Sequence, residues 1–212
     1  MHYVIDKVPL ATCTQSLLAK EQNDEARNSR TLQSARWQEL ACAQDRVDII
    51  VDEILKHFLQ YTDHSNCKAQ ILAVNRKECV LIKEAMDRGL EAKGMPCEWA
   101  DVIIHKSEHD HNLKQTPYGT EKEIDLIEYF AFTQDQWEDW NKEHYGSNHS
   151  RWRPALKVLI LSDRLISSLD ASIKQLVYID NPLLDENFLQ AIEQLGHNDI
   201  VLDYFGSFMF KT

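Results

Sequence analysis

The chain has 212 residues, 43% of them hydrophobic, which is enough for one substantial core and predicts one domain, at most with an appendage. Its longest apolar runs are about five residues, whereas a membrane-spanning helix needs roughly 20, so we expect no membrane or secretory segment. The 23 basic and 34 acidic residues give a formal net charge of −11. This charge disfavours strong autonomous binding to nucleic acid, although a local basic patch is compatible with it.

Cysteine usage predicts a reducing compartment. The five cysteines are odd in number, and none of them forms a Cys-x-x-Cys pair. Reduced thiols in a cytoplasmic protein are the simplest explanation. Cys79 lies inside an apolar helical pattern and is expected in the core.

The N-terminal part is predicted to be mainly helical. Residues 2–6 alternate apolar and polar side chains and could add a strand, while the polar residues 20–30 are typical of a solvated helix or a mobile segment. Apolar residues recur at helical spacing from Leu32 onward and most strongly from Val47 to Phe58, which predicts one long helix or two abutting ones ending near Gln60. We therefore assign residues 1–65 to a helical N-terminal lead-in.

A strand–helix–strand unit is predicted next. Residues 68–74 and 100–104 form short apolar runs typical of strands, and residues 77–90 carry a helical stripe. The inward face of that helix is predicted to hold Cys79, Leu81, Ile82, Ala85 and Met86.

The glycine pair in this unit does not predict a nucleotide site. Gly89 and Gly94 have the separation of a phosphate loop, but Met95 and Pro96 stand where a lysine and a serine or threonine are required. The sequence contains no Gly-x4-Gly-Lys elsewhere, so the motor domain that binds the nucleotide is not found in this chain.

Two polar clusters are better explained as surface. A loop after residue 104 could form a metal site by composition, but no second cluster supplies the spacing of a closed site, so we predict a polar loop. Its residues are His105, His109, Asp110 and His111. A second group imitates a nuclease Asp…Glu-x-Lys trio, yet it falls on or after a helix rather than on a strand. Its residues are Asp87, Glu91 and Lys93.

An aromatic-rich helical region is predicted at residues 120–145, within an insertion at about residues 106–154. Its candidate surface residues are Trp137, Trp140 and Trp152. We favour a role in covering the sheet edge, because tryptophan normally buries most of its area. An exposed cluster would instead mark a surface for a partner.

The last third of the chain predicts the fold. Residues 158–161, 176–179 and 200–202 are apolar runs too short for helices, each closely followed by an Asp. Parallel strands buried on both faces have this pattern, and residues 184–195 carry a helical stripe between two of them. We therefore predict an α/β three-layer domain with a mainly parallel central sheet. Chemistry in such sheets gathers at the carboxyl ends of the strands.

The motifs in this stretch follow one another in the order and spacing of a known family. They read Ser162-Asp163, then Ile166 to Ser172, Tyr178-Ile179-Asp180-Asn181-Pro182, Gln190 to His197, and Leu202-Asp203-Tyr204. They resemble the second RecA-like motor domain, of helicase C-terminal type, in the motor subunit of type I restriction enzymes of helicase superfamily 2. The resemblance implies a RecA-like, P-loop NTPase-like domain over residues 66–212.

The resemblance also implies degenerate ATPase motifs. In that family two arginines of the last helix reach the ATP phosphates bound on the partner motor domain, and here Gln194 and His197 stand in their places. Together with Asp170 and Gln190, which match the family, these residues form a nucleotide-facing remnant. No catalytic residue, metal or cofactor is therefore expected.

The same resemblance implies a place for nucleic acid. In the family, the loop and helix start after the first strand touch the nucleic-acid backbone, and Asn75, Arg76 and Lys77 stand there. Their side chains and the helix-start amides could bind phosphate. A basic first turn on a surface helix is an equally simple explanation.

Two functions follow from these observations. The first is a non-catalytic binding or adaptor module derived from the motor domain, docking on a protein partner or on itself, with no strong autonomous DNA binding. The second is the second motor domain of an ATP-dependent DNA translocase or restriction subunit, whose first motor domain another chain or a missing segment supplies.

Overall fold

The computed structural model describes residues 5–7, 40–60, 67–104, 123–162, 173–180 and 200–203. Several predictions lie outside these described residues: the polar run at 20–30, the histidine loop, the helix at 184–195, and the motif residues Asp170, Gln190, Gln194 and His197.

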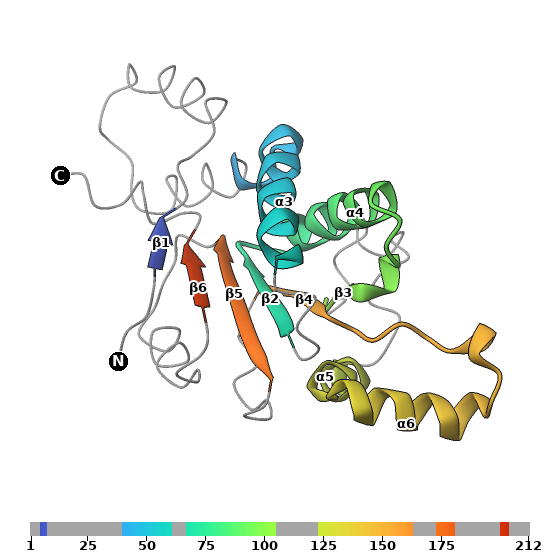
Figure 1. Cartoon of the computed structure of the whole chain (residues 1–212). Helices are drawn as coiled ribbons and strands as arrows, with labels where there is room; N and C mark the ends of the chain where they lie inside the picture. The colour runs from blue at the N-terminus through green and yellow to red at the C-terminus, as the bar shows by residue number, and fades with distance from the viewer. Residues whose placement is uncertain are drawn as a thin grey trace, which may run out of the picture.

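A six-stranded parallel sheet forms the centre of the described part of the chain (Figure 1). The order across the sheet is β1-β6-β5-β2-β4-β3. The strands are β1 (Ile5–Lys7), β2 (Cys67–Ala73), β3 (Ala100–Val102), β4 (Val158–Leu161), β5 (Lys174–Asp180) and β6 (Ile200–Asp203). The predicted α/β fold with a parallel sheet is therefore confirmed, and the N-terminal strand joins it beside β6.

The central strands are buried on both faces, which explains their unbroken apolar runs. All seven residues of β2 and all four of β4 are buried. Along β4, Val158 and Ile160 join one core cluster while Leu159 and Leu161 join another. Since successive side chains of a strand point to opposite faces, these two clusters are the two filled faces of the sheet.

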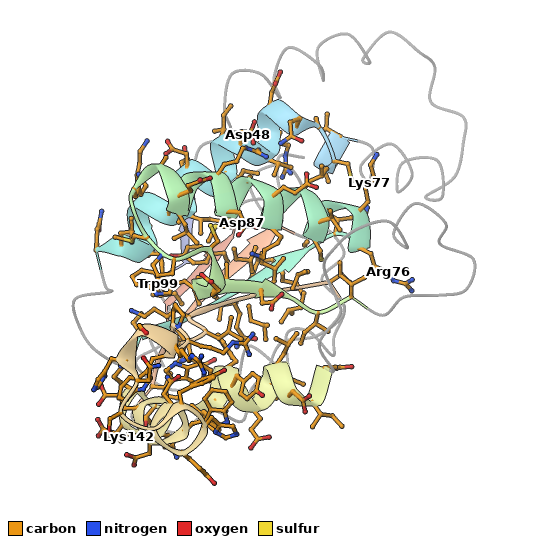
Figure 2. All side chains as sticks on the ribbon, turned by 90° about the vertical axis from the view of Figure 1, so that its right-hand side faces the viewer. Asp48, Arg76, Lys77, Asp87, Trp99 and Lys142 are labelled. Atoms are coloured by element: carbon orange, nitrogen blue, oxygen red, sulfur yellow. The ribbon has the colours of Figure 1, made fainter. Side chains whose placement is uncertain are left out.

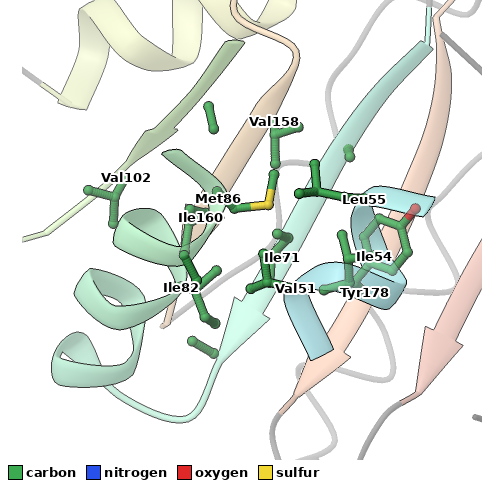
Figure 3. Close-up of a cluster of buried hydrophobic side chains, with 14 of the residues drawn as sticks. Val51, Ile54, Leu55, Ile71, Ile82, Met86, Val102, Val158, Ile160 and Tyr178 are labelled. Atoms are coloured by element: carbon green, nitrogen blue, oxygen red, sulfur yellow. The ribbon is translucent and has the colours of Figure 1, made fainter. Parts of the chain in front are cut away.

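The first face is covered by α3 (Gln44–Leu59) and α4 (Arg76–Ala92). Figure 3 shows their apolar stripes meeting the strand side chains, with Ile54 of α3 near Tyr178 of β5. Of the predicted inward residues of α4, only Leu81 is half-buried, at the margin of this cluster. Helix α3 belongs to the predicted lead-in, yet it fills the same cluster as β2; the boundary near residue 65 stays a prediction.

Gly89 in α4 and Gly94 just after it have structural explanations. Gly94 has φ +68° and ends the helix, with its amide donating to the Glu91 carbonyl and the Met95 amide donating to the Leu90 carbonyl, each at 2.9 Å. This is the Schellman arrangement that glycine favours. A Cβ on Gly89 would overlap Cδ1 of Leu55, so Gly89 allows α3 and α4 to approach closely.

The second face is packed by α5 (Glu123–Ala131), which is followed by α6 (Gln134–Tyr145). The predicted helical region is thus two helices. The break has a local cause, because Thr133 and Gln136 form a capping box in which each side chain accepts from the other's amide. Short 3-10 turns at Cys97–Trp99 and His149–Arg151 complete the described elements. No helix among the described residues has the length and apolar character needed to cross a bilayer.

Candidate functional site

The sheet changes its winding direction between β2 and β5. These strands pair over their whole length, from Cys67 beside Lys174 to Ala73 beside Asp180. After β2 the chain proceeds to β3 and β4 on one side, and after β5 it proceeds to β6 on the other. In open α/β sheets, ligands bind at the carboxyl ends of the strands at such a point. The candidate site is therefore the edge beyond Ala73 and Asp180.

Three buried charged side chains converge at this edge: Arg46 of α3, Glu78 of α4 and Asp180 of β5. We call them the edge cluster. Arg46 donates from Nη1 to Asp180 Oδ2 at 2.9 Å and from Nη2 to Asp180 Oδ1, a two-pronged pairing. The same Nη1 lies 3.2 Å from Glu78 Oε1 and 3.3 Å from the Ala41 carbonyl oxygen. Arg46 is 4% exposed, Asp180 1% and Glu78 0%, so water screens these contacts little.

Glu78 also holds the loop between β2 and α4. Its Oε2 accepts from the Val74 amide at 2.7 Å, and its own amide donates to Asn75 Oδ1 at 2.9 Å. Asn75 is thus the N-cap of α4, and Cys42 Sγ approaches the same Oδ1 at 3.6 Å. The oxygen of Asn75 therefore serves the protein's own backbone.

The basic residues predicted to contact nucleic acid begin α4 directly after this cap. Arg76 is half-buried and Lys77 is exposed, and Figure 2 shows both side chains at the end of α4 that faces the carboxyl edge. Their role in phosphate contact stays a prediction.

The charges of the edge cluster do not balance if every group is ionised. Burial, and then the Asp180 carboxylate, raise the pKa of Glu78 well above its ordinary value, although Arg46 opposes both effects. Burial lowers the pKa of Arg46, but the two carboxylates outweigh it and raise the pKa overall. One guanidinium thus faces two carboxylates, and Glu78 retains its proton more readily than a glutamate in water.

The predicted tryptophans lie away from the edge cluster. Trp137 is buried beside Tyr129 and Phe132, and its indole nitrogen donates to the Arg153 carbonyl at 2.7 Å; its role in covering the sheet edge stays a prediction. Trp140 and Trp152 are half-buried. Trp140 stacks between Trp137, with centroids 5.0 Å apart, and His144, at 4.0 Å.

Sequence reasoning missed the edge cluster, although a signal was present. Arg46 precedes Ile50 and Ile54 at four-residue steps on α3, and Glu78 precedes Ile82 and Met86 in the same way on α4. A charged residue on the apolar face of a helix must be buried with a partner. The two stripes therefore indicated one buried charge on each helix, but not the partner that each charge meets.

Nothing in the described part of the chain groups three or more His, Cys, Asp or Glu side chains as a metal site would. The histidine loop that we considered for such a role lies outside that part.

Comparisons with known proteins relate the chain to restriction enzymes. It is 30% identical over 155 residues to a protein of Methanocaldococcus jannaschii named "Putative type I restriction enzyme MjaVIIP endonuclease subunit". It is 28% identical over 140 residues to the MjaVIIIP endonuclease subunit, named in the same way, from the same organism. The matches cover 69% and 65% of this chain.

This chain spans only 13% of the length of each of these relatives. No family model matches the sequence, and no solved structure matches it. The similarity supports a relationship to type I restriction enzyme endonuclease subunits.

Proposed function

We propose that the chain is a non-catalytic binding or adaptor module of a type I restriction assembly. The observation that carries this proposal is that charged side chains at the carboxyl edge of the sheet are paired within the chain. Where an α/β sheet of this kind would receive a ligand, Arg46 of the chain itself reaches in from α3 and pairs with Asp180 and Glu78. These three charged side chains bind one another.

The sequence supports the same proposal. It contains no Gly-x4-Gly-Lys, and Gln194 and His197 stand where the resembling motor domains have arginines. Neither side chain supplies the permanent positive charge that stabilises a transferring phosphoryl group. A surface freed from this task can contact a protein, either another subunit or a second copy of this chain.

The test of the non-catalytic role is an ATPase assay on the purified chain, with and without DNA. We expect no turnover, because the loss of a transition-state arginine alone costs about 10³ to 10⁵ in rate. DNA-stimulated turnover that Asp170→Ala abolishes would refute the proposal.

Two surfaces are candidates for the partner. One is the stretch of residues 167–172 together with Gln190, Gln194 and His197, which the sequence predicts to lie on a loop and a helix; the other is the aromatic region of Trp140 and Trp152. Substituting Gln194 and His197 together by glutamate places unpaired charge on the first surface, which should dissociate a complex that buries it. Size-exclusion chromatography with light scattering, on the chain alone and with purified restriction subunits, compares this variant with the wild type. A complex that survives the substitution would assign the contact to the aromatic region.

A second candidate function is the second motor domain of an ATP-dependent DNA translocase. The observation that favours it is the length of the relatives, in which the matched region is 13% of the whole protein. Under this proposal, adding a separately purified first motor domain to the chain should restore DNA-stimulated ATPase. The adaptor proposal expects binding without turnover in the same mixture.

A further inference from the structure

The edge cluster places two buried carboxylates on one guanidinium. Arg46 Nη1 lies 2.9 Å from Asp180 Oδ2 and 3.2 Å from Glu78 Oε1. With both carboxylates ionised, the cluster would hold one uncompensated negative charge where Glu78 is 0% exposed. One proton on the carboxylate pair brings the cluster to zero net charge.

The groups that face Glu78 come from each neighbouring element. Arg46 comes from α3 and Asp180 from β5, and the Cys42 thiol comes from the segment before α3. Burial, and then Glu78, raise the pKa of Cys42, so this thiol is mainly protonated near neutral pH and adds no charge. Lys77, on α4 beside Glu78, is exposed to water.

The cluster joins three elements, α3, α4 and β5, at one point. Its contacts connect α3 to β5 through Arg46 and Asp180, and α3 to α4 through Arg46 and Glu78. Glu78 also holds the loop of residues 74–75 through the Val74 amide. A change in the net charge of the cluster therefore changes how firmly the loop before Arg76 and Lys77 is held.

We propose that the edge cluster is a proton-operated lock. With one proton bound, the cluster is neutral and fastens α3 and α4 to the end of β5. When the proton passes to solvent, the burial of the excess negative charge and the repulsion between Glu78 and Asp180 outweigh the stronger contacts that an ionised Glu78 makes with Arg46 and Val74, and the β2–α4 loop is released. This goes beyond the proposed binding function, because it gives the start of α4 two states that pH selects.

The first test is the pH dependence of unfolding. Because the pKa of Glu78 is raised in the folded protein, stability from the bound proton is fully present below the ordinary value of 4.5 and is lost as pH rises through the folded pKa. Within that window the unfolding equilibrium constant of the wild type should rise tenfold per pH unit relative to Glu78→Gln. Glutamine imitates the protonated acid and cannot lose the proton.

The matched control is Glu91→Gln, an exposed glutamate on the same helix. Urea titrations at a series of pH values should give this control the wild-type profile. Burial raises the pKa of Cys42 above its ordinary value of 9.0, so the comparison is made at and below neutral pH, where this thiol holds its proton in all three proteins. Parallel profiles for the wild type and Glu78→Gln would overturn the proposal.

The second test measures the opening of the β2–α4 loop directly. Hydrogen exchange of the Val74 amide, expressed as protection relative to amides of β2, should weaken with rising pH in the wild type and stay constant in Glu78→Gln. If that variant does not fold, an NMR titration of the wild type with isotope-labelled glutamate carboxyl groups is used instead. One glutamate carboxyl resonance should then titrate well above the others; if none does, the proposal is wrong.

Discussion

At the scale of single residues, α3 and α4 are joined by two arginine–carboxylate contacts of contrasting burial. Arg46 meets Glu78 and Asp180 in the interior, whereas Arg88 Nη2 meets Asp48 Oδ1 at 2.6 Å with both side chains about half exposed. Removing one partner of a buried pair leaves an unpaired charge in the interior, which is costly. Water screens the exposed pair, so its removal costs little.

We therefore expect Arg46→Ala to lower the free energy of unfolding by about 3–5 kcal/mol near neutral pH, since two carboxylates lose their only shared guanidinium in the cluster. Arg88→Ala, its control, should cost about 0–1 kcal/mol. Urea unfolding of both variants measures the difference. Equal losses would show that the edge cluster contributes no more than a surface pair.

Lys68 is a second buried charge, on the opposite face of β2. Its ammonium donates to the Leu156 carbonyl and lies 5.7 Å from the ring centre of Phe130. Burial, and then repulsion from Lys157, lower its pKa from 10.5 to about 8. Between these values the unfolded chain binds the proton that the folded protein lacks, so stability rises with pH there.

Lys68→Met should abolish that rise. Each pKa unit corresponds to about 1.4 kcal/mol, so the wild type should gain about 3 kcal/mol relative to the variant as pH rises from about 8 to about 10.5. Denaturant unfolding across this range measures it, with the exposed Lys93→Met as control. A constant difference between wild type and Lys68→Met would contradict the expected shift.

At the scale of elements, the contact of α3 with α4 depends on Gly89. A methyl group there would overlap Cδ1 of Leu55, which is 1% exposed and enclosed by the core. Alanine favours a helix over glycine by about 1 kcal/mol, but overpacking costs about 1–3 kcal/mol.

Gly89→Ala should therefore lower the melting temperature in spite of its better helix propensity. Leu55→Val removes the overlapping methyl, so the double variant should be more stable than the sum of the single effects, by about 0.5–3 kcal/mol. Thermal and urea unfolding of the four proteins in this cycle give the coupling. If the two single effects simply add, the helices can move apart to accommodate the methyl group, and the predicted overlap with Leu55 is wrong.

At the scale of the whole molecule, charge limits the binding of nucleic acid. The net charge is −11, and phosphate neutralisation by basic side chains supplies most non-specific affinity. We expect a dissociation constant weaker than roughly 1 μM for duplex or single-stranded DNA at physiological salt, measured by fluorescence anisotropy.

Any binding that is observed should depend on Arg76 and Lys77, at the start of α4. Replacing both with alanine should reduce the slope of affinity against salt by about two phosphate contacts. A tight complex that this double substitution leaves unchanged would show that nucleic acid binds elsewhere on the molecule.

Much of the fold was predictable from the sequence because its signals are local. Four-residue steps of apolar side chains indicated α3 and α4, and short continuous apolar runs indicated β2, β4, β5 and β6. The boundary between α5 and α6 was not predicted, since it depends on the side-chain geometry of Thr133 and Gln136. The relation to type I restriction enzymes likewise came from short motifs in order, and the comparisons support it.

The sequence by itself determined the class of fold, the positions of the buried stripes and the parallel direction of the central strands. The tertiary structure alone decided that Arg46 meets Glu78, 32 positions away, and Asp180, 134 positions away. The physical reason is that periodicity records only which face of an element is buried. Which buried charges become partners depends on how α3, α4 and β5 cross, and that crossing is a property of the packed chain.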